Sequence, residues 1–193
     1  MKRICVFCGS NPGNNPVFLR TAESLGRFLA QNDVELVFGG GSVGLMGKIA
    51  DTVLAEGGRV IGVIPKSLAD KEVAHEGLTE LQIVDSMHTR KAMMEELSDG
   101  FIALPGGFGT FEELCEIITW AQLGFHSKPC GFLNVDGYYD PLIDLFDKAT
   151  AERFVHPEHR KLVLIEKDIE KMFGKMVEYR APKLEKWLDR EET

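Results

Sequence analysis

The chain has 193 residues, of which 44% are hydrophobic, a length that suits one domain with one well-buried core. Thirty acidic residues against 22 basic ones give a net charge of -8, and no run of Lys or Arg exceeds two residues. This balance excludes a face that binds polyanions, so neither nucleic acid nor a membrane surface is expected as a partner. A small nucleotide, with few phosphates, remains compatible with it.

Targeting and metal-binding patterns are weak throughout the sequence. The first apolar run covers only residues 4–7, too short for a signal peptide or a membrane span, so we expect a cytoplasmic protein with reduced cysteines. Cys5 and Cys8 form a CxxC, but an offset of three places them on opposite faces of a strand. A proline separates His156 from His159. No metal site is expected from either pair.

Seven continuous apolar runs, separated by helical patterns, predict strands at residues 4–7, 34–38, 60–64, 81–84, 101–104, 130–135 and 162–165. Continuous hydrophobicity is typical of strands covered on both faces. Helices are predicted at residues 16–31, 45–56, 86–98, 110–123, 140–152 and 168–179. The prediction is an α/β fold: one Rossmann-like domain over residues 1–180, with a doubly wound parallel sheet of about seven strands and helices on both faces. Residues 181–193 form a charged tail.

Ligands of such sheets bind at the carboxyl ends of the strands, and three glycine-rich loops follow predicted strands there. They span residues 8–11, 39–47 and 105–110. Three such loops on one edge predict a pocket built largely from backbone. Ser10 and Asn11, in the first loop, are candidates for its wall.

The third loop has the layout of an anion site. Gly106, Gly107 and Gly109 lie between a strand and a helix and leave no Cβ to keep a ligand from the backbone amides. Thr110 and Glu113 have the spacing of a capping box, in which Glu113 would only satisfy the helix terminus. The alternative is that the Glu113 carboxylate contacts the sugar of a ligand whose phosphate the loop binds.

The second loop contains Gly39-x-Gly41-x-x-Gly44, a weak match to the dinucleotide fingerprint. The following strand ends in Pro65 and not in the acidic residue that would bind a ribose, which argues against NAD. A Walker loop is excluded as well, because Lys48 is followed by isoleucine. These glycines otherwise allow close packing of a strand on a helix. No cofactor is expected.

Arg90 and Lys91 lie in the first turns of the helix predicted at residues 86–98. The helix dipole disfavours cations at that end, so either solvent screens the pair or an anion compensates it. Glu72, His75 and Glu76 lie in the loop before this region. Cations beside carboxylates on a ligand-binding edge favour a phosphosugar site with acid/base chemistry.

Two motifs resemble one known family. The sequence LPGGFGTFEE at residues 104–113 matches the PGGxGTxxE motif of the Lonely Guy (LOG) family, and SMHTRKAMM at residues 86–94 matches its MHxRK segment. The similarity extends from about residue 4 to residue 165. Members are cytokinin riboside 5'-monophosphate phosphoribohydrolases, many of them formerly labelled lysine decarboxylases. Lys48 lies beyond its glycine loop, so the sequence gives no support for a pyridoxal-binding lysine.

The resemblance implies that Arg90 and Glu113 are catalytic. It also implies a set of substrate contacts, to which the first two glycine loops add Ser10 and Gly41. The predicted site residues are therefore Ser10, Gly41, Glu72, Arg90, Lys91, Gly107, Phe108, Gly109, Thr110, Glu113 and Thr119. The expected reaction is hydrolysis of the N-glycosidic bond of an adenosine 5'-monophosphate, N6-prenylated or plain. The alternative is a nucleotide-binding sensor that hydrolyses nothing.

The resemblance also implies a homodimer. Two helices offer apolar residues for it, namely Met87, Met94, Leu114, Ile118 and Trp120. Ordinary packing in the core is the other explanation for these residues.

Overall fold

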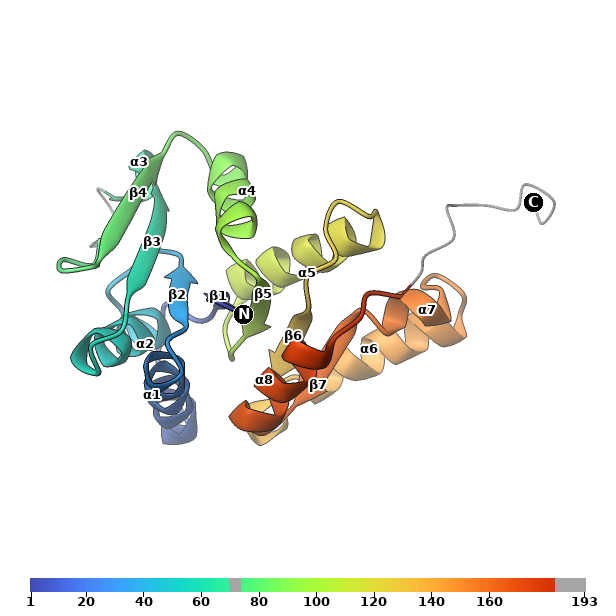
Figure 1. The fold of residues 1–193 in the computed structure, drawn as a ribbon. Coiled ribbons are helices and arrows are strands. Elements are labelled where there is room, and N and C mark those ends of the chain that lie inside the picture. Colours follow the sequence, from blue (N-terminus) through green and yellow to red (C-terminus); the bar gives the residue numbers. More distant parts are fainter. Residues whose placement is uncertain (70–73, 183–193) are drawn as a thin grey trace.

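The computed structural model describes residues 1–69 and 74–182 of the chain (Figure 1). The strands are β1 (Arg3–Phe7), β2 (Glu35–Phe38), β3 (Val60–Pro65), β4 (Glu80–Val84), β5 (Gly100–Ala103), β6 (Cys130–Leu133) and β7 (Val163–Glu166). The helices are α1 (Pro16–Gln31), α2 (Gly44–Ala55), α3 (Lys66–Ala69), α4 (Met87–Leu97), α5 (Phe108–Gln122), α6 (Asp140–Ala151), α7 (Pro157–Arg160) and α8 (Ile169–Glu178), with a 3-10 turn η1 (Val135–Gly137).

The strands form one parallel sheet in the order β4-β3-β2-β1-β5-β6-β7. Ile4 of β1 pairs with Leu36 of β2 on one side and with Gly100 of β5 on the other. The chain therefore runs outward from β1 in one direction, returns, and continues outward from β5. The predicted doubly wound sheet is confirmed, and its strand order reverses between β1 and β5, where ligands bind in this class of fold.

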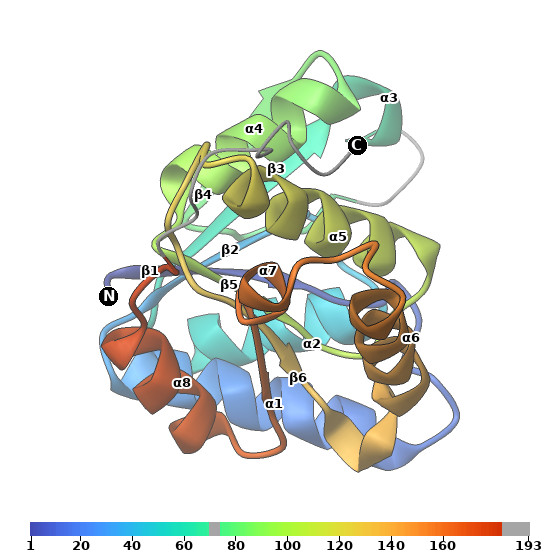
Figure 2. The same cartoon turned by 90° about the vertical axis from the view of Figure 1, so that its right-hand side faces the viewer.

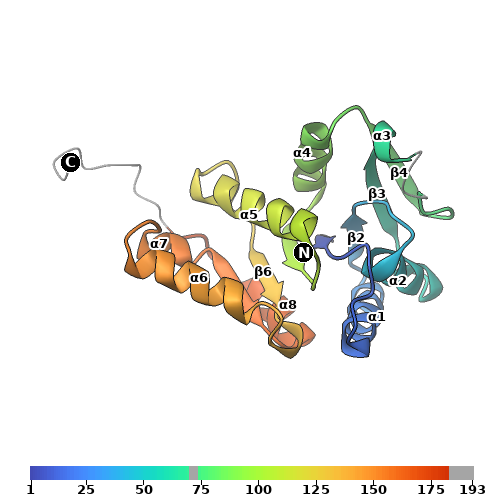
Figure 3. The same cartoon turned by 180° about the vertical axis from the view of Figure 1, so that it is seen from behind.

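Helices cover both faces of the sheet. Apolar residues of α1, α2 and α8 pack on one face, and those of α4, α5 and α6 pack on the other. Figures 1 and 3 show α4 and α5 across the sheet from α1 and α2, and Figure 2 shows the same layers from the side. Cys5 and Cys8 lie in different cores, as their spacing predicts, and all four cysteines are free.

Local sequence signals explain where several helices begin. Asn15, Ser86 and Asp168 are the N-caps of α1, α4 and α8, and each side chain accepts a hydrogen bond from a backbone N–H of the first turn. The short helices α3 and α7 were not predicted, because four residues are too few to show a hydrophobic period. Of the predicted tail, residues 183–193 lie outside the described part of the chain.

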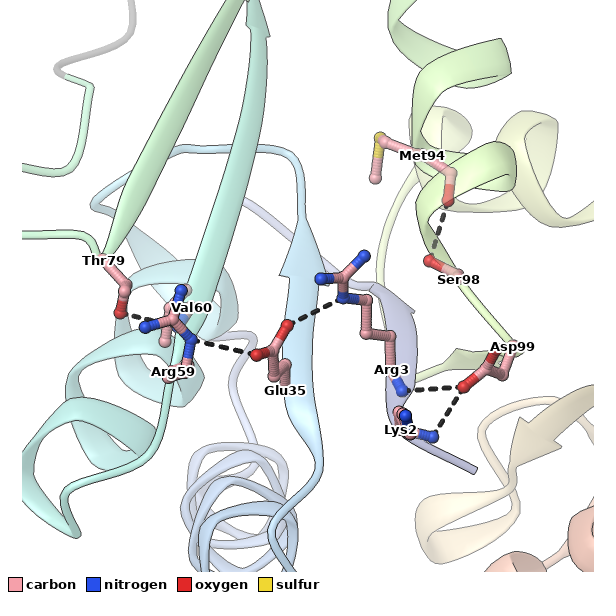
Figure 4. A network of polar contacts seen from close by, with 9 residues as sticks. All are labelled: Lys2, Arg3, Glu35, Arg59, Val60, Thr79, Met94, Ser98 and Asp99. Atoms are coloured by element: carbon pink, nitrogen blue, oxygen red, sulfur yellow. Dashed lines mark hydrogen bonds and ion pairs between the residues drawn. The ribbon is translucent and has the colours of Figure 1, made fainter.

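Polar contacts at the amino ends of the strands hold the sheet together on the side away from the glycine loops (Figure 4). The Glu35 carboxylate accepts hydrogen bonds from Nε of Arg3 at 2.7 Å and from Nε of Arg59 at 2.9 Å. The Asp99 carboxylate accepts from the backbone N–H groups of Lys2, at 2.6 Å, and Arg3, at 3.0 Å. This network fixes the start of β1 between its two neighbours.

Candidate active site

The three glycine loops meet at the carboxyl ends of the central strands. The backbone N–H of Gly9 donates to the carbonyl of Pro105 at 3.0 Å, and the N–H of Leu45 donates to the carbonyl of Gly9 at 3.0 Å. A Cβ on Gly44 would lie 2.3 Å from the backbone carbon of Ser10. The first loop is therefore held between the other two, and glycine at residue 44 is needed for this close approach.

Arg90, one turn into α4, reaches across the ends of the strands and is 8% exposed. Its Nε donates to the carbonyl of Val63 at 3.0 Å, its Nη1 to Oε1 of Glu113 at 2.8 Å, and its Nη2 to the carbonyl of Gly39 at 3.4 Å. Three different segments thus fix the guanidinium group. The cation at the start of this helix is compensated by a carboxylate and not by solvent.

Glu113, on α5, is the partner of Arg90 and is also buried. Burial raises the pKa of Glu113, and the opposing effect of the Arg90 charge does not cancel it. Among the described residues, a hydrogen bond is formed to Oε1 but none to Oε2. One oxygen is therefore held by the arginine and the other is available to a ligand.

The capping-box interpretation of Glu113 is wrong. Helix α5 begins at Phe108, with Gly107 as the N-cap, so Thr110 is the third helical residue and Glu113 the sixth. Gly107 provides no side-chain cap. The helix begins two residues earlier than predicted. Thr110 packs against the loop, since a Cβ on Gly106 would lie 2.1 Å from Oγ1 of Thr110. Glu113 is too far from the terminus to satisfy it.

The amino terminus of α5 is open to a ligand. An ideal Cβ on Gly107 or Gly109 would meet no atom within 4 Å, and Phe108 between them is 92% exposed. The first amides of a helix have no partner within the helix, and within residues 1–69 and 74–182 no side chain caps those of α5. Free amides at the positive end of a helix dipole, next to the Arg90–Glu113 pair, are suited to bind a phosphate.

Two tyrosines that the sequence interpretation missed support this loop. The hydroxyl of Tyr139 donates to the carbonyl of Leu104 at 2.6 Å, and the hydroxyl of Tyr138 donates to the carbonyl of Gly106. Oδ1 of Asn134 accepts from the backbone N–H of Tyr139 at 2.8 Å. Their place in the sequence, shortly after β6 and thus at the same edge of the sheet as the glycine loops, could have indicated this role.

Of the remaining predicted site residues, Ser10 and Gly41 lie in the first two glycine loops, and Thr119 lies farther along α5. Ser10 is exposed at the end of the first loop, and Gly41 is buried in a bridge with Ala74. Thr119 is exposed, its hydroxyl donates to the carbonyl of Cys115 at 2.8 Å, and it lies about 9 Å along the α5 axis from Glu113. Glu72 lies outside the described residues.

Lys91 also differs from expectation. Its ammonium group lies 2.9 Å from Oε2 of Glu116 and also contacts Oε1 of Glu112, and the side chain is 8% exposed. It faces two carboxylates of α5 and not the open amides of that helix.

Fold and site together define a Rossmann-like protein with an open helix terminus beside a buried arginine–carboxylate pair. A family model described as possible lysine decarboxylase matches residues 46–176, and the chain belongs to this family. The resemblance to Lonely Guy proteins is confirmed.

Relatives with assigned activities are similar over most of this chain. Probable cytokinin riboside 5'-monophosphate phosphoribohydrolase LOGL1 of Oryza sativa subsp. japonica is 55% identical, over 92% of this chain and 79% of the relative. Cytokinin riboside 5'-monophosphate phosphoribohydrolase LOG1 of Arabidopsis thaliana is 49% identical, over 96% of this chain and 86% of the relative.

A solved structure of a molybdenum cofactor binding protein from Rippkaea orientalis superposes with a TM-score of 0.69 at 21% identity, covering 92% of this chain and 97% of the other. The molybdenum cofactor carrier protein of Chlamydomonas reinhardtii gives 0.68 at 19% identity, covering 92% and 96%. At these identities the likeness extends to the fold alone.

Proposed function

We propose that this protein is a phosphoribohydrolase, which hydrolyses the N-glycosidic bond of an adenosine 5'-monophosphate, N6-prenylated or plain, to free base and ribose 5-phosphate. The observation that carries the proposal is the buried contact of 2.8 Å between Arg90 and Glu113 beside the open terminus of α5. The activities named for the Oryza and Arabidopsis relatives support the same substrate class.

The reaction follows from where the charges lie. As the glycosidic bond stretches, C1' becomes positive and the base negative. Ionised Glu113 stabilises the sugar cation and orients a water molecule, whose hydroxyl adds to C1' and whose proton goes to the leaving base. Arg90 positions the ribose phosphate and keeps the carboxylate in place. The amides of residues 107–110 hold the phosphate.

The description as a lysine decarboxylase names a different chemistry, which needs a lysine facing a pyridoxal site. Lys48, which follows the second glycine loop, instead pairs with Glu23 of α1 at 3.0 Å. Among the described residues, no group of three or more His, Cys, Asp or Glu side chains could hold a metal ion. The proposed hydrolysis uses neither pyridoxal nor a metal ion.

The test is incubation of the purified protein with adenosine monophosphate and with its N6-prenylated form, followed by chromatography for free base and ribose 5-phosphate. Release of both products supports the enzyme. Binding of the nucleotide without any release would instead identify a nucleotide sensor.

We also propose a cytoplasmic homodimer in which residues 1–180 are one domain. Two of the residues predicted for its interface are excluded, because Met94 and Leu114 are buried in the core. Met87 of α4 is 40% exposed and Phe125, after α5, is 74% exposed, so apolar side chains near both helices remain exposed for an interface. Light scattering should give twice the chain mass of 21.5 kDa, and a value near that mass would reject the dimer.

None of the helices within residues 1–69 and 74–182 is long and apolar enough to span a membrane.

A further inference from the structure

Two consecutive cations of α4 meet carboxylates of α5. Arg90 pairs with Glu113, and Lys91 pairs with Glu112 and with Glu116. The two helices lie next to each other on one face of the sheet (Figures 1 and 3). Both cations therefore bridge the same pair of helices, but only Arg90 also contacts the ends of the strands.

The spacing on α5 explains why a lysine fits this position. Glu112 and Glu116 are one helical turn apart, so their carboxylates lie on the same side of the helix, while Glu113 is turned by about 100° toward Arg90. An ammonium group is a compact charge with three donors and can bind both carboxylates at once. Its position then fixes the rotation of α5 relative to α4.

Charge gives the contact a second effect. Oε2 of Glu116 is buried, and no hydrogen bond from the described residues satisfies it apart from its ion pair with Lys91. The negative charge of Glu112 raises the pKa of Glu113, whereas the positive charge of Lys91 lowers it. Without Lys91, two carboxylates one turn apart would repel each other and Glu113 would ionise less readily.

The same contacts argue against a role in binding phosphate. Lys91 is buried, and to reach a ligand at the α5 terminus its side chain would have to leave both carboxylates. Burial lowers the pKa of Lys91, but the hydrogen bonds with Glu112 and Glu116 outweigh burial and raise it. The amine therefore stays charged where it is.

We propose that Lys91 is a positioning residue: it holds Glu112 and Glu116 so that the neighbouring Arg90 meets Glu113 in the geometry that the reaction needs. This inference rests on the proposed phosphoribohydrolase function and assigns Lys91 a task other than substrate contact.

Lys91→Met tests the proposal, with kcat, KM and the inhibition constant of ribose 5-phosphate as readouts. Because the sugar phosphate is bound elsewhere, we expect kcat to fall by about tenfold or more, while KM and the inhibition constant change by less than about threefold. Lys91→Arg, which keeps a cation, should recover part of kcat. Lys128→Met is the matched control, since Lys128 forms an ion pair of 2.6 Å with Glu95 of the same helix, and Glu95 is not one of the predicted site residues.

A double-mutant cycle covers the case in which Lys91→Met fails to fold. In a Glu112→Gln/Glu116→Gln background no carboxylates remain for the ammonium group to hold. Adding Lys91→Met should therefore cost much less activity there than in the wild type. An equal loss in both backgrounds, or a tenfold rise in KM and in the inhibition constant with kcat unchanged, would overturn the proposal in favour of phosphate binding. Base release by the wild type tests the proposed function separately, because the positioning role is judged only from ratios of variant to wild type.

Discussion

Gly39 lies directly against Arg90: a Cβ built on Gly39 would be 2.1 Å from Nη2 of the arginine. The carbonyl of Gly39 also accepts a hydrogen bond from that nitrogen at 3.4 Å, across 51 residues of sequence. A side chain at residue 39 would therefore occupy the place of the guanidinium group. The glycine is required for the position of Arg90 and not for a turn.

Gly39→Ala should inactivate the protein without unfolding it. The atom that the new methyl group meets is the end of a flexible side chain, so Arg90 moves and the backbone does not. We expect kcat/KM for base release to fall by more than about tenfold, because the reacting groups are misplaced. The disturbed buried hydrogen bonds should cost about 1 to 3 kcal/mol of stability. Steady-state kinetics and chemical denaturation measure the two effects.

Gly174→Ala is a suitable control, because a Cβ at this position in α8 meets no atom within 4 Å. It should keep full activity and gain up to about 1 kcal/mol of stability, since alanine is the better helix former. Full activity of Gly39→Ala itself would show that the observed position of Arg90 is not needed.

The sequence shows the glycine pattern of the second loop but not the contacts that require these glycines. Gly39-x-Gly41-x-x-Gly44 suggested either a dinucleotide site or close packing of strand on helix. In the structure Gly39 makes room for a side chain from α4, and Gly44 approaches the backbone at Ser10. Contacts between segments so far apart in sequence leave no trace in local spacing.

Selectivity for 5'-monophosphates is expected from the open amides of residues 107–110. Charge-assisted hydrogen bonds to a phosphate contribute a few kcal/mol, so kcat/KM for adenosine should be about a hundredfold or more below that for its monophosphate. Parallel assays of the two substrates measure this ratio. Equal turnover would show that the α5 terminus does not bind the phosphate.

Tyr138→Phe and Tyr139→Phe should have different effects, although the two residues are adjacent. Tyr138 is 37% exposed and holds the carbonyl of Gly106, so its loss should raise KM for the nucleotide by about two- to tenfold as the loop loosens. Tyr139 is 1% exposed, and its loss leaves the buried carbonyl of Leu104 unsatisfied, at a cost of about 1 to 3 kcal/mol in stability. Kinetics and denaturation of both variants test this contrast, and identical phenotypes would contradict it.

Sequence patterns predicted the regular elements well because each strand and long helix has a period that a single segment reveals. The interval between Arg90 and Glu113 was recognised by its resemblance to a family, whereas their contact depends on how α4 and α5 pack. The start of α5 was predicted two residues late, since Thr110 and Glu113 imitate a capping box. The contacts of Lys91 were missed for the same reason as those of Gly39: they join elements distant in sequence.

The pH dependence of the reaction should report the ionisation of Glu113. Burial raises the pKa of this carboxyl group above its ordinary value of 4.5, and the reaction needs it charged. The acid limb of kcat/KM, which reflects the free enzyme, should therefore lie above pH 4.5. A raised pKa in the folded state means that the contribution of Glu113 to stability is fully present below the unfolded pKa and is lost as pH rises through the folded value. An acid limb at or below 4.5 would contradict this assignment.

Glu113→Gln separates binding from catalysis. The amide keeps the size of the side chain and can still accept a hydrogen bond from Arg90, but it removes the negative charge beside C1'. We expect a loss of about 3 to 5 kcal/mol in transition-state stabilisation, roughly a hundred- to several-thousandfold in rate. Nucleotide affinity should change little, because the amides of residues 107–110 are untouched. Base release and calorimetric titration with adenosine monophosphate measure the two quantities.

The control for this variant is Glu96→Gln, which makes the same substitution at an exposed position of α4 and should change neither rate nor affinity. Melting temperatures of both variants exclude unfolding as the cause of any loss. If folded Glu113→Gln retains more than about a tenth of wild-type turnover, the loss is under roughly 1.4 kcal/mol. The carboxylate would then serve only as the structural partner of Arg90, and the proposed mechanism would be wrong.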